Sequence, residues 1–155
     1  MGDDTLQQLL DEKAATLAVL ALTRAVDERD WDAVRAAFAP TVLFDMSSMG
    51  AGPATHTPGA EIAAAWEEGL THLEAVHHQM ANFEIELVDD GANVFCYGTA
   101  YHYLPNDTGR NTRTFVGTYD FHVTPIDGTW RIDAMRYDLK FIDGNADLEG
   151  TASES

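Results

Sequence analysis

The stretch "EAVHHQMANFEIEL", residues 74–87, decides the fold, because it opens the strand-forming half of the chain and places two histidines side by side. Its second part alternates between apolar and polar residues, which is typical of a β-strand with one buried face. Neighbouring side chains on a strand point to opposite faces of the sheet. Only one of His77 and His78 can therefore face the interior.

The phase of this strand has two solutions. Unbroken alternation places His77 on the same face as Phe83 and the apolar residues after it. A bulge or bend near Ala81–Asn82 would exchange the faces and place His78 there instead. Periodicity alone leaves both solutions open.

The first 70 residues predict helices and one strand. Apolar residues from Leu6 to Val26, most of them leucines, recur at three- and four-residue spacing with alanines between them. Asp30 is a good cap for a second helix, which Pro40 ends. The expected helices cover residues 5–28, 31–38 and 58–70, and the expected strand covers residues 41–46.

The remainder predicts four long antiparallel strands joined by short loops and turns. Helices first and strands afterwards indicate an α+β fold. We expect a cone-shaped, curved antiparallel sheet wrapped around the long N-terminal helix, with two further helices, as in a cystatin-like α+β barrel. The closed inside of such a cone is a natural pocket. The four strands are expected at residues 77–88, 94–104, 112–125 and 129–142.

The length and composition indicate one globular domain. The chain has 155 residues, of which 45% are hydrophobic and 10% aromatic. We expect a single domain over residues 1–143 and an acidic, disordered tail over residues 144–155. The first residues have neither a basic leader nor an apolar core, and no apolar run approaches 18 residues. These features predict a soluble, cytoplasmic protein.

Charge and missing motifs exclude several classes of function. A net charge of −17 disfavours nucleic acid and anionic membrane surfaces as partners. The single cysteine, Cys96, allows neither an intrachain disulfide nor a cysteine zinc site. Motifs of nucleotide-binding proteins, zinc proteases and esterases are missing, and no two histidines have helical i, i+4 spacing. We expect neither a metal ion nor a cofactor.

Asp27 is the first candidate for chemistry. It lies at the end of the long helix, where the macrodipole disfavours a carboxylate. It shares a helix face with Leu20 and Thr23, at the edge of the apolar stripe. Asp27 is either a solvated acid in the loop "DERD" or a buried acid, and a buried acid needs a cation or a hydrogen-bond donor. A histidine would serve.

The later strands are rich in tyrosine. Aromatic rings on sheets are mostly packing residues. Together, however, they could line an apolar cavity and offer a few hydroxyl donors, which suits a flat, oxygenated organic molecule. The five tyrosines are Tyr97, Tyr101, Tyr103, Tyr119 and Tyr137.

Three segments resemble a known family. "AVDERDWDAVRAAFAPTVLFDMSS" (residues 25–48), "HHQMANFEI" (residues 77–85) and "IDGTWRIDAMRYDLKFIDGN" (residues 126–145) are similar to the SnoaL-like branch of the nuclear-transport-factor-two-like superfamily. Within that branch the resemblance is to scytalone dehydratase-like proteins, and it covers roughly residues 10–145. It implies the α+β cone described above.

The resemblance also implies site residues. The catalytic aspartate of the family falls on Asp27 and its catalytic histidine on His78. Its second histidine corresponds to His102 after a two-residue shift. A family tyrosine falls on Met46 and a family asparagine on Tyr119, so the polar groups around the substrate differ here. With Met46, the other residues expected to bind the substrate are Trp66, Tyr97, Tyr101 and Phe121.

The implied function is a cofactor-independent dehydratase, a lyase. An Asp–His dyad would remove water from a β-hydroxy carbonyl, polyketide-like or steroid-like molecule, while Tyr119 or Tyr101 polarises the substrate oxygen. The alternatives are an isomerase or polyketide cyclase with the same dyad, or a non-catalytic small-molecule-binding domain. The expected partner is an apolar, oxygenated small molecule, and the resemblance implies a homodimer or homotrimer.

Overall fold

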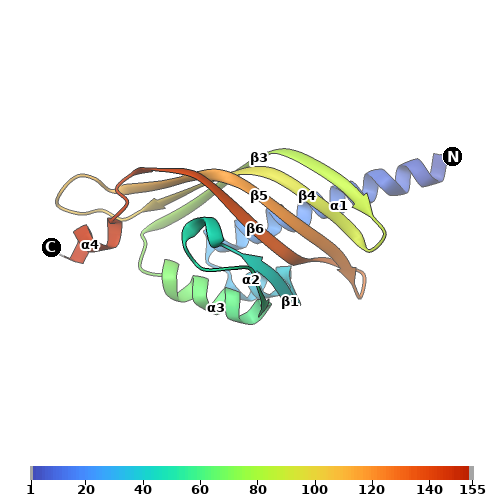
Figure 1. The fold of residues 1–155 in the computed structure, drawn as a ribbon, viewed down its shortest axis with the longest axis horizontal. Helices are drawn as coiled ribbons and strands as arrows, with labels where there is room; N and C mark the ends of the chain where they lie inside the picture. The colour runs from blue at the N-terminus through green and yellow to red at the C-terminus, as the bar shows by residue number, and fades with distance from the viewer. Residues whose placement is uncertain (1, 154–155) are drawn as a thin grey trace.

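The fold is a curved sheet packed against a long helix (Figure 1). The computed structural model describes residues 2–153 and the side chains of residues 2–150. In chain order the elements are α1 (Gly2–Glu28), α2 (Trp31–Ala37), β1 (Phe38–Asp45), a short 3-10 turn η1 (Ser47–Met49), β2 (Thr55–Pro58), α3 (Gly59–Leu70), β3 (Ala75–Val88), β4 (Gly91–Tyr103), β5 (Thr112–Ile126), β6 (Thr129–Gly144) and α4 (Leu148–Ser153).

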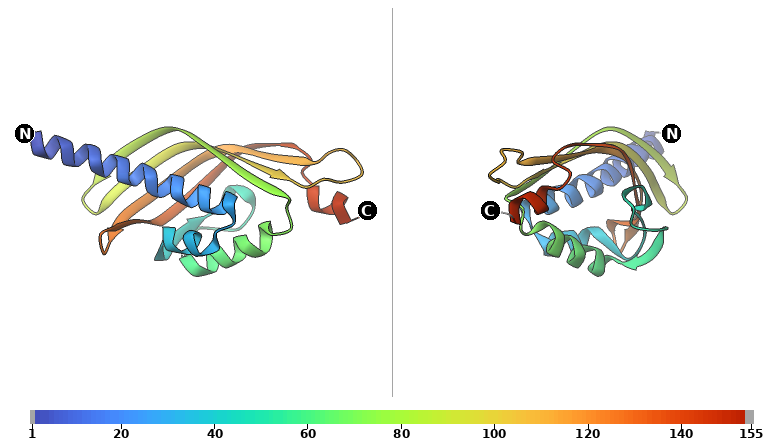
Figure 2. Two further views of the ribbon diagram at one scale, coloured as in Figure 1. Left: turned by 180° about the vertical axis from the view of Figure 1, so that it is seen from behind. Right: turned by 60° about the vertical axis from the view of Figure 1, so that its left-hand side comes forward.

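The sheet confirms the α+β class and corrects two details of the prediction. Its strand order is β2-β1-β6-β5-β4-β3, and Figure 2 shows it arching over the helices. The sheet is mixed, because β1 runs parallel to β6. No tight hairpin joins these two strands, so the local sequence does not impose an antiparallel pair. The sheet also does not close into a barrel, since β2 and β3 form its two edges within the described residues.

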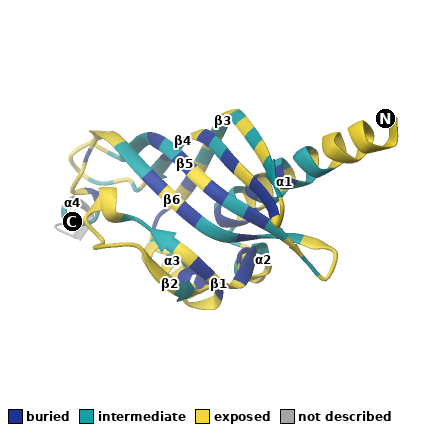
Figure 3. Ribbon diagram, turned by 45° about the vertical axis from the view of Figure 1, so that its right-hand side comes forward, coloured by how far each residue is buried: buried dark blue, intermediate teal, exposed yellow. Residues whose placement is uncertain are grey.

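The packing face of α1 consists of alanines and valines together with one leucine. The second half of the helix lies against the concave face of the sheet, and the first half projects beyond it, exposed to solvent (Figures 2 and 3). The leucines that marked the predicted apolar stripe are largely exposed: Leu6, Leu9, Leu10, Leu17 and Leu20. The buried residues are Ala15, Val19, Leu22, Ala25 and Val26. Among residues 2–153, no helix combines the length and apolar character needed to cross a membrane.

The C-terminal segment, for which the sequence predicts a disordered tail, begins with residues that pack onto the fold. Asn145 is buried, and its backbone N–H donates to the carbonyl of Thr112 at 2.8 Å. Leu148, at the start of α4, belongs to the main hydrophobic core. The predicted count of two helices beyond the first is therefore too low by one.

A bulge in β3 settles which histidine faces the interior. Ala81 pairs with Tyr97 and Glu84 pairs with Phe95, so two residues of β3 oppose one residue of β4. Asn82 has a φ of 56°, the left-handed conformation that asparagine adopts more readily than most residues. The predicted irregularity is confirmed. The side chain of His78 is 12% exposed, whereas that of His77 is 65% exposed.

This bulge generates the first prediction. Asn82→Val should lower the free energy of unfolding by about 1–2 kcal/mol, because a β-branched residue disfavours the left-handed conformation. Asn82→Gly should leave stability unchanged or raise it. Urea unfolding measures both changes, and Ala81→Val is the matched control on the neighbouring residue. A fully stable Asn82→Val protein would contradict the bulge.

Candidate active site

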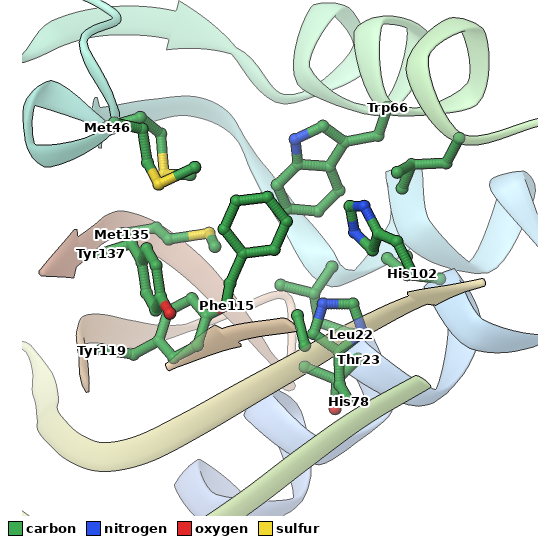
Figure 4. Close-up of a pocket in the computed structure, with 14 residues that line it drawn as sticks. Leu22, Thr23, Met46, Trp66, His78, His102, Phe115, Tyr119, Met135 and Tyr137 are labelled. Atoms are coloured by element: carbon green, nitrogen blue, oxygen red, sulfur yellow. The ribbon is translucent and has the colours of Figure 1, made fainter. Parts of the chain in front are cut away.

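The concave side of the sheet lines a partly open cavity of about 160 Å³ (Figure 4). Its walls come from α1, α3, the strands and the segment around η1. Most of the lining is apolar: Leu22, Val26, Met46, Met49, Trp66, Leu70, Ala100, Phe115 and Met135. The polar lining residues are Thr23, His78, His102, Tyr119 and Tyr137. Among the described residues, none with a full formal charge lines this cavity.

Asp27 and His78 form a close pair at the cavity wall. The Nδ1 atom of His78 lies 2.7 Å from one carboxylate oxygen of Asp27. The backbone N–H of His78 donates to the other oxygen at 2.9 Å. Since a carboxylate accepts hydrogen bonds, Nδ1 carries the proton in neutral His78 and Nε2 keeps a lone pair. The two contacts fix both the position and the tautomer of the ring.

The end of α1 is tied to the start of β3, which holds Asp27 in place. Arg29 follows the helix with a φ of 58°, and its guanidinium donates to the carbonyl of the buried Leu73. Asp27 itself is 18% exposed. The unfavourable dipole at this helix end is thus offset by two N–H donors from one residue of β3.

His102 occupies a different electrostatic environment. Its Nδ1 accepts a hydrogen bond from Nη2 of Arg113 at 3.0 Å. Burial lowers the pKa of His102 to about 4, and the positive charge of Arg113 acts in the same direction. His102 is therefore neutral at pH 7, with its proton on Nε2.

Two buried tyrosines stand side by side on β5 and β6. The ring centroids of Tyr119 and Tyr137 are 4.6 Å apart. Each ring covers a glycine of the neighbouring strand: a Cβ at Gly98 would lie 2.1 Å from the ring of Tyr119, and one at Gly117 would lie 2.8 Å from that of Tyr137. Burial raises the pKa of Tyr119 and brings that of Tyr137 to about 12, so both phenols stay protonated as donors.

The segment after β1 covers one side of the cavity. Within η1, the hydroxyl of Ser48 donates to the carbonyl of Tyr137 at 2.5 Å and accepts from the N–H of Leu139 at 3.0 Å. These two bonds dock η1 on β6 and bring Met46 and Met49 to the cavity.

The structure brings several of the predicted site residues together at the cavity. Met46 and Trp66 line the cavity together with His78, His102 and Tyr119. Asp27 does not line the cavity and lies behind His78.

Three residues that the sequence predicts to bind the substrate do not line the cavity. Tyr97 and Tyr101 lie on the outer face, because Ala100 and His102 of the same strand face the cavity and side chains alternate. Tyr101 donates to the side chain of Gln79, and Tyr97 is 47% exposed. Phe121 is buried, but it stacks against Tyr119 in the core at 5.3 Å and does not line the cavity.

Sequence reasoning missed Phe115 and the role of Tyr137 in the lining. Phe115 could have been found, since it shares the alternation of Tyr119 along β5. Tyr137 is directly paired with Tyr119 across the strands, but this register was not predictable. Among residues 2–153, no three His, Cys, Asp or Glu side chains gather in a way that would hold a metal ion.

Comparison with known proteins gives a family match and several structural neighbours. A sequence model of the SnoaL-like domain matches residues 7–136. A search of curated protein sequences found no match. Among solved structures, the Kfla4162 protein from Kribbella flavida has a TM-score of 0.85 and 20% identity, covering 91% of this chain and 97% of its own.

Two further neighbours carry the names of enzymes. A candidate scytalone dehydratase from Novosphingobium aromaticivorans has a TM-score of 0.76 and 18% identity, over 94% of this chain and 92% of its own. The hexachlorocyclohexane dehydrochlorinase LinA-type3 from Novosphingobium barchaimii has a TM-score of 0.68 and 18% identity, over 89% of this chain and 94% of its own. Identities of this size show the shared fold alone.

The hydroxyl of Tyr137 generates a second prediction. It is buried and has no hydrogen-bond partner among the residues that the structure describes. Tyr137→Phe should therefore raise the free energy of unfolding by about 1 kcal/mol, because it removes an unsatisfied polar group. Chemical denaturation measures the change, with the exposed Tyr103→Phe as the control. A less stable Tyr137→Phe protein would show that the hydroxyl has a partner inside the fold.

Proposed function

The chain belongs to the SnoaL-like domain family, and from this premise and the cavity we propose that it is a cofactor-independent acid–base enzyme. The specific reaction we propose is the elimination of water from a β-hydroxy carbonyl compound, which makes the protein a carbon–oxygen lyase. The observation that carries the proposal is the Asp27–His78 pair at the wall of an apolar cavity.

His78 is the proposed base. Its Nε2 takes a proton from the carbon next to the substrate carbonyl, and the carboxylate of Asp27 stabilises the imidazolium that forms. The pair is suited to this task because Asp27 also holds the backbone of His78, so the ring cannot turn away. The apolar lining keeps water away and strengthens the electrostatic interaction.

The phenols of Tyr119 and Tyr137 are the proposed donors to the carbonyl oxygen. Negative charge develops on this oxygen as the proton leaves, and preorganised donors stabilise it most effectively in a site with little water. The unsatisfied hydroxyl of Tyr137 supports this role, since a substrate oxygen would supply its missing partner. Tyr101, the other candidate from the sequence, faces outward and has no part in the proposed reaction.

The hydroxide leaves with the proton that His78 carries. The carbon–hydrogen and carbon–oxygen bonds break, a carbon–carbon double bond forms, and water departs, so His78 returns to its starting state. His102 donates its Nε2–H to the departing oxygen. Two structural neighbours are named for eliminations, a candidate dehydratase and a dehydrochlorinase, which supports this class of reaction.

The size of the pocket sets the least that the substrate must place in it. An apolar cavity of about 150 Å³ holds a single benzene ring. A pocket of about 160 Å³ can therefore hold one ring of the substrate, and the rest of the molecule can extend through its open side. The lining of methionines and aromatic rings fits an apolar, oxygenated ring compound of the polyketide type.

The third prediction tests the pair. His78→Gln and Asp27→Asn should each lower kcat by about 10²–10⁴-fold, because they remove general acid–base catalysis. The assay uses a panel of one- and two-ring β-hydroxy ketones and measures turnover by mass spectrometry. His56→Gln is the matched control, since this exposed histidine on β2 does not line the cavity and should keep full activity.

The product mass separates the competing functions. A product lighter than the substrate by one water indicates a dehydratase, and a product of equal mass indicates an isomerase or cyclase. A ligand recovered unchanged indicates a binding domain. Full activity in folded His78→Gln or Asp27→Asn protein would refute the pair as the catalytic unit, and thermal unfolding verifies that each variant folds.

A further inference from the structure

The C-terminal segment after β6 contacts Arg113, which in turn contacts the cavity-lining His102. It leaves β6 and is held by two hydrogen bonds of Asn145, from its backbone to Thr112 and from its side-chain amide to the carbonyl of Arg110 at 3.0 Å. Leu148 then inserts into the core and α4 begins (Figure 1). This anchoring places Glu149 against the side of the sheet that carries His102.

Glu149 binds Arg113 through both of its oxygens. Nη1 of Arg113 donates to one oxygen at 2.6 Å and Nη2 donates to the other at 2.7 Å. This two-point contact lowers the pKa of Glu149 to about 2, chiefly through the hydrogen bonds from Arg113. The Arg113 side chain is 14% exposed and that of Glu149 is 41% exposed, so the pair is partly shielded from solvent.

The same guanidinium determines the tautomer of His102. Nη2 of Arg113 has two hydrogens, and its contacts run to Glu149 and to Nδ1 of His102. An arginine cannot accept a hydrogen bond and does not lose its proton in proteins. Nδ1 of His102 must therefore be the acceptor, and the proton of the neutral ring must be on Nε2.

We propose that Glu149 is a positioning residue for the candidate active site: it holds Arg113 against Nδ1 of His102 and thereby keeps His102 as a neutral Nε2–H donor lining the cavity. The catalytic meaning of this donor rests on the proposed function, whereas the network itself does not. In the proposed reaction, His102 can then donate to the departing oxygen without competing with His78 for the proton.

The charged and titratable groups around His102 give Glu149 two opposite effects. Arg113, His78 and His72 disfavour a positive charge on His102, and Glu149 alone favours it. The negative charge of Glu149 favours the protonated form of His102, so losing that charge would by itself lower the pKa of His102 further. Glu149 also holds the guanidinium of Arg113 in place, so removing Glu149 would release Arg113 and raise the pKa of His102 towards its ordinary value. The direction in which the pKa of His102 changes therefore shows which of these two effects is larger.

The fourth prediction uses this sign. In the full-length protein, Glu149→Ala should raise the pKa of His102 from about 4 by at least about one unit, a tenfold change in proton affinity, and should populate both neutral tautomers. Ring ¹⁵N shifts between pH 3 and 8 measure both quantities, and a His102→Gln spectrum assigns the signal. Arg113→Met should produce the same two changes.

The exposed Glu84 on β3 provides the matched control. Glu84→Ala changes the net charge equally and should leave the His102 signal unchanged. If Glu149→Ala keeps the wild-type tautomer, or leaves the pKa equal or lower, the positioning role is refuted. The NMR measurement needs no substrate. If the His102 signal responds as expected but the protein has no turnover, the network is supported and the proposed reaction is not. If the protein has turnover but the His102 signal does not respond, the proposed reaction stands and the positioning role of Glu149 does not.

Discussion

The contact between the Asp27 carboxylate and His78 is the interaction on which the rest of the site depends. It joins the end of α1 to β3 through a ring nitrogen and a backbone N–H of the same residue. A carboxylate at the end of a helix opposes the macrodipole, so the position is favourable only with such donors. The contact also requires the bulge at Asn82, because a regular strand could not turn both His78 and Phe83 inward. One helix end, one bulge and one histidine are therefore a single structural unit.

Sequence reasoning succeeded where local patterns determine the outcome and failed where tertiary pairing does. The order of the main elements, apart from β2 and α4, and the α+β class followed from periodicity. The choice of His78 came from family resemblance joined to the need of Asp27 for a donor. The outward positions of Tyr97 and Tyr101 depended on the phase of β4, which Gly98, Ala100 and His102 do not mark by hydrophobicity. The packing face of α1 was only partly predicted: Val26 belongs to the expected stripe and is buried, whereas the other buried residues of the helix lie outside that stripe.

Burial explains why an apolar cavity can still offer directed polar groups. Moving a phenol out of water raises its pKa and moving an imidazole out of water lowers its pKa, so each is driven to its neutral form. A neutral phenol and a neutral imidazole are both hydrogen-bond donors. The glycines beneath Tyr119 and Tyr137 allow both rings to lie close to the sheet, which fixes where their hydroxyls can point. Rigid neutral donors suit the stabilisation of a charge that exists only in the transition state.

The two histidines of the cavity show how residues outside the cavity can divide one side-chain type into two roles. His78 faces a carboxylate through Nδ1, so its Nε2 is a proton acceptor. His102 faces a guanidinium through Nδ1, so its Nε2–H is a hydrogen-bond donor. Neither Asp27 nor Arg113 lines the cavity, yet each determines the chemistry of the ring in front of it. An elimination needs one group to remove a proton and another to bind the leaving oxygen. Exchanging the two partners would exchange the two roles, so the assignment of base and donor lies in Asp27 and Arg113 rather than in the histidines themselves.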